Sequence, residues 1–277
     1  MNLDPHFFPF RAWHYSIHPQ CEMILTKSDG FHSGLGLYVF IRTTKVMGMI
    51  QNGYSYISAA AIKVGSDVVE IQGDGSLIVN GNDTFNNKDA ATLEVASGIF
   101  SLAKTTNANK DEMNHVAVGT PIYDLYFRDD TGDMCSIQVS TNKWEMMFVN
   151  LFGTFPVDSV GLLGSPAHLP LFARDGKTDL RSDHNALGDE WQVRSDEPQL
   201  FQDKTYVPQH PERCIYEEIE GSEKSNIRRR LNLDNPISPK AATEACAQAS
   251  DYKREACIQD VLATGFLELA SDSFYQS

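Results

Sequence analysis

The chain contains no apolar run approaching the roughly 18 residues that are needed to span a bilayer. Its first residues also lack the basic start and the apolar core of a signal peptide. We therefore expect no membrane insertion, and if the protein is secreted, its signal peptide is not part of this sequence.

Positive charge is scarce as well, because 23 Lys+Arg stand against 37 Asp+Glu and the formal net charge is -14. A surface this acidic repels phosphate backbones and anionic lipids, so neither nucleic acid nor a membrane surface is an expected partner. A simpler explanation of the negative charge is that it keeps the protein soluble.

Cysteines are few, and none of the five forms a CxxC pair or has metal-ligand spacing. Their number fits a lightly disulfide-bonded secreted protein or a cytosolic protein with scattered buried thiols, and composition does not choose between these. The five are Cys21, Cys135, Cys214, Cys246 and Cys257.

Helical patterns are missing between residues 21 and 151, where short runs of β-branched and aromatic residues dominate. Residues 35–43 are one such run, and Gly-containing turns at 65–67 and 73–75 separate others. Many short strands joined by tight turns predict antiparallel hairpins and argue against a parallel α/β sheet. We therefore predict a mainly β protein, either a sandwich or a barrel.

The amino-acid composition changes after residue 195. Residues 196–236 are polar and proline-containing, which predicts a linker. Ser238 followed by Pro239 is a good helix start, and residues 237–277 favour two short helices. On one continuous helix, Cys246 and Cys257 would lie about 16 Å apart, so they can bridge only if the chain folds back as a helical hairpin.

Recognisable catalytic motifs are also absent: there is no HExxH, no Gly-rich phosphate loop and no nucleophile turn. His168 and His184 flank Asp175, and a His–Asp pair can act as a general base. A hydrolase-like enzyme using these residues is therefore an alternative. Convergence of the three side chains in one pocket would favour it, and scattered surface positions would not.

Four short motifs, in this order, resemble the von Willebrand factor type D domain. They match that family's Gly-Asp-Pro-His opening, Gly-x-Cys strand, Gly-Leu-Cys-Gly-Asn loop and Phe-Gly-x-x-Trp closing element. In this sequence they are Asp4-Pro5-His6-Phe7, Gln20-Cys21-Glu22, Gly161-Leu162-Leu163-Gly164 and Leu187-Gly188-Asp189-Glu190-Trp191.

The resemblance covers about residues 4–195 and implies an antiparallel β-sandwich domain over residues 1–195. Residues 237–277 are similar to a reduced form of the cysteine-rich helical module, the C8 module, that often follows such domains. The family implies an extracellular setting and a non-enzymatic role in adhesion, matrix building or multimeric assembly. Expected partners are other proteins, a second copy, or other domains of a larger secreted polypeptide, reached through exposed sheet edges and the helical tail.

The resemblance also implies a disulfide between Cys21 and Cys214. With Cys246 and Cys257 paired, Cys135 is left over, either as a buried inert thiol or as an intermolecular link. Its position in a strand pattern favours burial.

The family's calcium site looks degenerate in this sequence. Calcium takes about six to eight oxygen ligands, and the matching positions hold Arg11 and Ser165. We therefore hypothesise that Arg11 replaces the ion and pairs with Asp175 or an adjacent acid. We expect no metal and no cofactor.

Three further expectations remain. Asn82-Asp83-Thr84 is a glycosylation acceptor if the protein is secreted. The run Arg228-Arg229-Arg230 is either a processing site or a solvated charge run that pairs with upstream glutamates. Because type D domains also occur in lipid-transport proteins, a lipid- or small-ligand-carrying domain is another alternative, and it would require a large apolar cavity.

Overall fold

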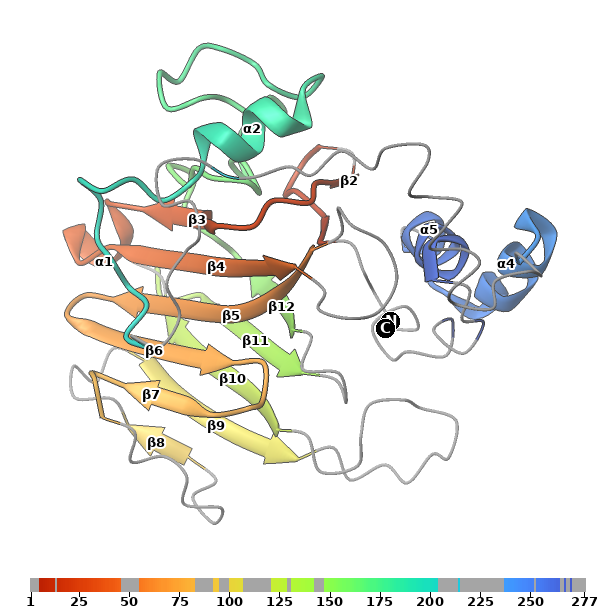
Figure 1. Ribbon diagram of the computed structural model, residues 1–277. Helices are drawn as coiled ribbons and strands as arrows, with labels where there is room; N and C mark the ends of the chain where they lie inside the picture. The colour runs from red at the N-terminus through yellow and green to blue at the C-terminus, as the bar shows by residue number, and fades with distance from the viewer. Residues whose placement is uncertain are drawn as a thin grey trace.

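Two five-stranded antiparallel sheets lie face to face in the computed structural model, which confirms the predicted mainly β sandwich (Figure 1). None of the described helices has the length and apolar character that crossing a membrane requires. The structure describes residues 5–12, 14–45, 55–82, 92–94, 100–106, 121–128, 131–141, 147–203, 214, 237–251, 253–264, 267 and 270.

The first sheet is a meander in which each strand pairs with the next one along the chain. Its strands, in spatial order, are β3 (Glu22–Ser28), β4 (Leu37–Lys45), β5 (Ser55–Val64), β6 (Asp67–Gln72) and β7 (Leu77–Val79). The predicted turns at Gly65 and Gly75 have positive φ values of 61° and 81°, which glycine adopts without steric cost. A short helix, α1 (Phe31–Gly34), lies between β3 and β4.

The second sheet is also a meander. Its order is β12 (Met147–Gly153), β11 (Met134–Thr141), β10 (Pro121–Arg128), β9 (Phe100–Thr106) and β8 (Thr92–Glu94). Along β10, Tyr123, Leu125 and Phe127 are buried, whereas Tyr126 and Arg128 are exposed. This period of two separates an inner face, which packs on the first sheet, from an outer face.

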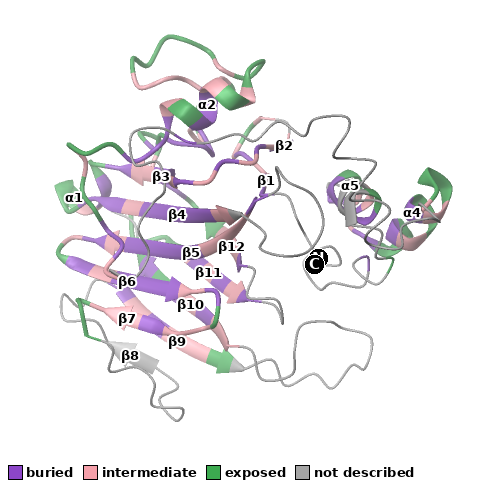
Figure 2. Ribbon diagram, viewed as in Figure 1, coloured by how far each residue is buried: buried purple, intermediate pink, exposed green. Residues whose placement is uncertain are grey.

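Buried residues concentrate on the middle strands of the first sheet (Figure 2). Aromatic rings fill the end of the core near α1, where Phe127 lies edge-on to both Phe31 and Phe155, with ring centroids 5.4 and 6.1 Å apart. The core therefore joins the second sheet to the segment that follows β12.

Two later segments occupy the outer edge of β3. The amide of Lys27 donates to the carbonyl of Val160 (2.8 Å), and the amide of Ile24 donates to the carbonyl of Trp191 (2.8 Å). In the loop Gly161–Gly164, which we call the Gly161 loop, the carbonyl of Leu163 accepts a hydrogen bond from the amide of Phe10 (3.1 Å). The N-terminal hairpin, β1 (His6–Phe7) with β2 (Tyr15–Ser16), is thus joined to the sandwich through that loop.

Helix α2 (His184–Glu190) positions Trp191. Asp183 caps its N-terminus by accepting a hydrogen bond from the amide of Ala186, as expected of an aspartate at this position. Trp191, at the other end, is 2% exposed, and its Nε1 donates to the carbonyl of Phe172 (3.1 Å).

Residues 193–203, which we call the strap, cross the outer face of the first sheet (Figure 1). Leu200 and Phe201 are buried there, and the guanidinium of Arg42 lies 4.3 Å from the Phe201 ring centroid. Residues 196–203 of the strap were predicted to belong to a linker. They lie on the sheet because Leu200 and Phe201, two apolar side chains in this polar stretch, are buried there. The rest of residues 196–236, apart from Cys214, lies outside the described residues.

The tail contains α4 (Pro239–Ala245), the 3-10 turn η2 (Cys246–Gln248) and α5 (Arg254–Thr264). Ser238 accepts a hydrogen bond from the amide of Ala241 and so caps α4 as predicted. A small cluster around the Cys246–Cys257 disulfide packs against Phe8 and Tyr56. The helical hairpin predicted over residues 237–277 is only partly described.

Candidate functional site

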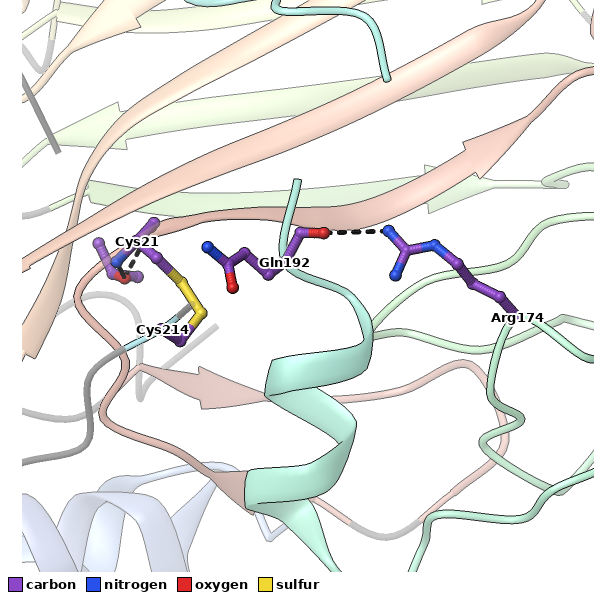
Figure 3. Close-up of a disulfide and its surroundings, with 5 residues drawn as sticks. Cys21, Arg174, Gln192 and Cys214 are labelled. Carbon is purple, nitrogen blue, oxygen red and sulfur yellow. Dashed lines mark hydrogen bonds between the residues drawn. A yellow bond between two sulfur atoms is a disulfide. The ribbon is translucent and has the colours of Figure 1, made fainter. Parts of the chain in front are cut away.

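The disulfide between Cys21 and Cys214 joins the start of β3 to the chain beyond the strap (Figure 3). The two Cα atoms are 5.2 Å apart, and both side chains are fully buried. Together with the Cys246–Cys257 bridge, whose Cα atoms are 5.9 Å apart, it gives both cysteine pairs that the sequence led us to expect. Two such bridges indicate an oxidising environment.

Hydrogen bonds also fix Cys21, the residue that precedes β3. The amide and the hydroxyl of Thr43 both donate to the carbonyl of Cys21 (2.9 and 3.1 Å). Gln192, which follows Trp191 in the chain, lies between the disulfide and Arg174 (Figure 3). Its carbonyl accepts a hydrogen bond from the guanidinium of Arg174 (3.0 Å). The covalent bridge therefore lies in a segment that is already held by buried polar contacts.

Arg174 is the centre of a charged network. Its guanidinium lies 4.9 Å from the Trp191 ring centroid and 2.8 Å from the carboxylate of Glu197, which also contacts Lys27 at 3.3 Å. Burial lowers the pKa of Arg174, and the neighbouring Glu197 opposes that change. The network ties the start of the strap to β3 and to the loop that contains Arg174.

An open pocket of about 770 Å³ lies next to this network. Val157, Val160, Phe172 and Trp191 give it apolar walls. Charged side chains also line it: Lys27, Asp29, Asp158, Arg174, Arg194, Asp196 and Glu197.

The histidines and the aspartate of the enzyme hypothesis contact different partners. His168 is exposed and lines the pocket, whereas the ring of His184 stacks on Tyr15 with centroids 4.8 Å apart. The carboxylate of Asp175 accepts hydrogen bonds from the hydroxyl of Thr178 (2.7 Å) and from the amides of Thr178 and Lys177 (2.8 Å each). His184 and Asp175 are thus engaged by different neighbours, and His168 faces the pocket.

Arg11, which we expected to replace a calcium ion, reaches the loop that follows Gly161, but it does not pair with Asp175. The guanidinium donates instead to the backbone carbonyl of Pro166. Ser165 donates its hydroxyl to the carbonyl of Val157 (2.7 Å). The carboxylate of Asp175 is already satisfied within its own turn, which explains why it does not pair with the arginine. In the described ranges, no group of three or more His, Cys, Asp or Glu side chains is placed to hold a metal ion.

The described residues of the sequence motifs, such as His6 and Gly161, take part in local hydrogen bonds, packing and turns. His6 Nδ1 lies 2.6 Å from the hydroxyl of Ser16, across the β1–β2 pair, and Pro5 is buried beside it. Gly161 has a φ of 131°, and a Cβ atom there would lie 2.8 Å from the carbonyl oxygen of Leu25. Gly164 also has a positive φ, of 67°. Asp4 lies outside the described residues.

Cys135 takes part in neither disulfide and is 1% exposed, so the buried alternative is the one observed. Its thiol donates to the carbonyl of Thr154. Asn82, the expected glycosylation acceptor, is exposed. The Arg228-Arg229-Arg230 run lies outside the part of the chain that the structure describes.

The two outer faces of the sandwich differ. The strap covers part of the outer face of the first sheet, whereas the outer face of the second sheet exposes three large apolar side chains. Tyr126, Met134 and Phe152, which we call the outer patch, are 39%, 48% and 51% exposed. The register pairs Tyr126 with Ser136 and Ser136 with Phe152, so Tyr126 and Phe152 lie in one row across three strands.

Sequence reasoning did not identify the outer patch. The alternation along β10, β11 and β12 places these side chains on one face, but alternation does not reveal which outer face the chain itself covers. Apolar side chains gathered on one exposed face mark interaction sites more often than single ones do.

No protein-family model matches the chain, and no curated protein matches its sequence.

Proposed function

We propose that this protein is an extracellular, non-enzymatic module of the von Willebrand type D kind, which contributes to adhesion, matrix building or multimeric assembly. It binds other proteins, or other domains of a larger secreted polypeptide, through the outer patch. The observation that carries the proposal is the asymmetry of the sandwich. One outer face is crossed by the strap, and the opposite face exposes Tyr126, Met134 and Phe152.

Rigidity supports this role. The patch lies on paired strands of a sandwich, and a buried disulfide ties the start of the first sheet to Cys214, so little ordering is needed when a partner binds. The non-enzymatic part is supported by the different neighbours of His184 and Asp175: His184 stacks on Tyr15, and Asp175 is bound within its own turn.

The test is a binding assay to cells or matrix, carried out with the full chain and with variants of it. The double variant Tyr126→Ser with Met134→Ser removes apolar area from the patch but keeps the buried faces, so we expect binding to weaken at least tenfold. Leu169→Ser is the matched control, because Leu169 is an exposed apolar residue (54%) in a loop away from the second sheet. Equal binding by both variants would overturn the proposal.

Sizing the native material with and without reductant belongs to the same experiment. It separates assemblies held by disulfides from assemblies held by the patch. Because Cys135 is buried, we expect no reductant-sensitive dimer through that thiol.

A second candidate function, carrying a small ligand, is favoured by the 770 Å³ pocket beside Trp191. Its lining is partly apolar and partly charged, which suits an amphipathic molecule better than a lipid chain. A small molecule retained in native mass spectra of the purified protein would support this function.

A further inference from the structure

The pocket beside Trp191, which we call the Trp191 pocket, has a volume of about 770 Å³. Three segments of the chain line it: the end of β3 with the residue after it, residues 157–176, and residues 191–197. The backbones of Lys27 and Val160 are joined by two hydrogen bonds (2.8 and 2.9 Å), which hold the first two segments together. The pocket is therefore largely preformed, as small-molecule sites usually are.

Apolar side chains form one part of the lining. Val157 and Val160 are 69% and 39% exposed, and Phe172 is half-buried. Trp191 is a fixed wall, because its side chain is buried and its Nε1 already donates to the carbonyl of Phe172. Exposed apolar side chains around a pocket favour a ligand that has an apolar or aromatic body.

The basic side chains of the lining already have acidic partners. Lys27 and Arg174 both contact the carboxylate of Glu197, at 3.3 and 2.8 Å. The guanidinium of Arg194 lies 3.2 Å from the carboxylate of Glu190. An anionic ligand would have to compete with these carboxylates for the same donors, so the basic groups are a poor anion site.

Three aspartates of the lining, which we call the acidic rim, are used differently. Asp29, Asp158 and Asp196 are exposed, and none of them forms an ion pair with any residue that the structure describes. Asp158 accepts a hydrogen bond from the hydroxyl of Ser28 (2.7 Å), and Asp29 accepts one from the hydroxyl of Tyr38 (2.7 Å). These donors are neutral, so they orient two of the carboxylates and leave the negative charge of the rim uncompensated.

The overall charge also favours a positive ligand. Four acidic and three basic side chains line the pocket, and the whole chain has a formal charge of -14. Negative potential at a concave site raises the local concentration of cations. A bare metal ion would gain nothing from the apolar walls, because it is bound by several oxygen ligands at one point. An organic cation uses both parts of the lining.

We propose that the Trp191 pocket binds a small organic cation, with an apolar or aromatic body and one ammonium or guanidinium group. The body packs on the apolar walls, and the charged group lies at the acidic rim. This deepens the second candidate function, on which it rests, by naming the chemical class of the ligand. Since the rim is exposed, salt screens the attraction, and binding weakens as ionic strength rises.

The first test is isothermal titration calorimetry of the full chain with three probes of one shape at neutral pH and low salt. 2-Phenylethylamine is the cation, 2-phenylethanol is its neutral analogue, and 3-phenylpropionate is the matched anion. We expect the amine to bind at least tenfold more tightly than either of the other two. An amine that binds no more tightly than the alcohol or the acid overturns the proposal.

The second test removes charge from the acidic rim. In the double variant Asp29→Asn with Asp196→Asn, the amide oxygen at position 29 can still accept the hydrogen bond from Tyr38. Each exposed ion pair contributes little, so we expect amine binding to weaken by about fivefold while alcohol binding stays unchanged.

The matched control is Asp74→Asn with Asp251→Asn. It removes the same charge at two exposed positions outside the pocket lining, and asparagine can still accept the hydrogen bond that Asp74 receives from the amide of Ser76. This variant should bind the amine as the wild type does. Equal loss in both double variants, or no loss in the rim variant, overturns the proposal.

The ligand class and the ligand-carrying function can fail separately. If the acid or the alcohol binds saturably and the amine binds no more tightly, the pocket carries a small ligand but the proposed class is wrong. If none of the three probes binds and native mass spectra show no retained molecule, the ligand-carrying function fails as well.

Discussion

At the scale of single residues, the turn at Asp175 shows how an exposed carboxylate can be used structurally. Hydrogen bonds, first from the hydroxyl of Thr178 and then from the backbone amides of Thr178 and Lys177, lower the pKa of Asp175 from 3.8 to about 2. Because the pKa is lowered in the folded protein, the ionised form stabilises the turn. That contribution is present above pH 3.8 and is lost as the pH falls through about 2.

We predict that Thr178→Val raises the pKa of Asp175 toward 3.8, since it removes the strongest of these hydrogen bonds. The measurement is an NMR titration of the Asp175 carboxyl carbon. Lys177→Gln serves as the control, because it keeps the backbone amide that donates to the carboxylate and should change the midpoint little. An unchanged pKa in Thr178→Val would show that the hydroxyl does not hold the carboxylate in solution.

The elements that could be predicted from the sequence are those with local signals. Alternating apolar residues and Gly-containing turns such as Gly65 predicted the hairpins, and Ser238 with Pro239 predicted the start of α4. These signals depend on backbone preferences over a few residues. The family resemblance added the Cys21–Cys214 pair, which spans 193 positions and which spacing alone could not have assigned.

Elements that depend on distant contacts could not be predicted. The strap lies in a polar segment, and only its contacts with Glu70 and Arg42 on the sheet reveal that Leu200 and Phe201 are buried. The same holds for the edge of β3. Exposed sheet edges were expected in general, but distant contacts cover the outer edge of β3 with residues 160–163 and 191–193.

At the scale of the elements, Glu70 on β6 holds the strap. Its carboxylate accepts hydrogen bonds from the amides of Gln202 and Asp203 and from the side chain of Gln72. Burial raises the pKa of Glu70 above 4.5, and the two backbone hydrogen bonds and the nearby Arg42 oppose this rise only in part. A raised carboxyl pKa means that the folded state binds the proton more tightly than the unfolded state does.

We therefore predict that Glu70 makes the protein lose stability as the pH rises from 4.5 through its raised pKa. Urea unfolding of the wild type and of Glu70→Gln between pH 4 and pH 7 measures this, because glutamine does not titrate. The free energy of unfolding of the wild type should fall relative to that of the variant across this interval. Parallel curves would show that the strap does not keep Glu70 desolvated in solution.

At the scale of the whole molecule, the two disulfides differ in the length of chain that each one closes. Cys21–Cys214 spans 193 positions and Cys246–Cys257 spans 11. In the chain-entropy account, a disulfide stabilises by restricting the unfolded state, and longer loops are restricted more. The account gives about 5 kcal/mol for the long loop and about 3 kcal/mol for the short one.

We predict that replacing both Cys21 and Cys214 by serine lowers the free energy of unfolding by more than the same replacement of Cys246 and Cys257 does. Urea unfolding followed by far-ultraviolet circular dichroism measures both losses. The long bridge also anchors the chain beyond the strap, so trypsin should cut after Arg194, which lies in the strap, faster in the first variant alone. If the two double variants lost equal stability and the strap stayed protected in both, the contacts of Glu70 and Phe201 would hold the strap without the covalent bond.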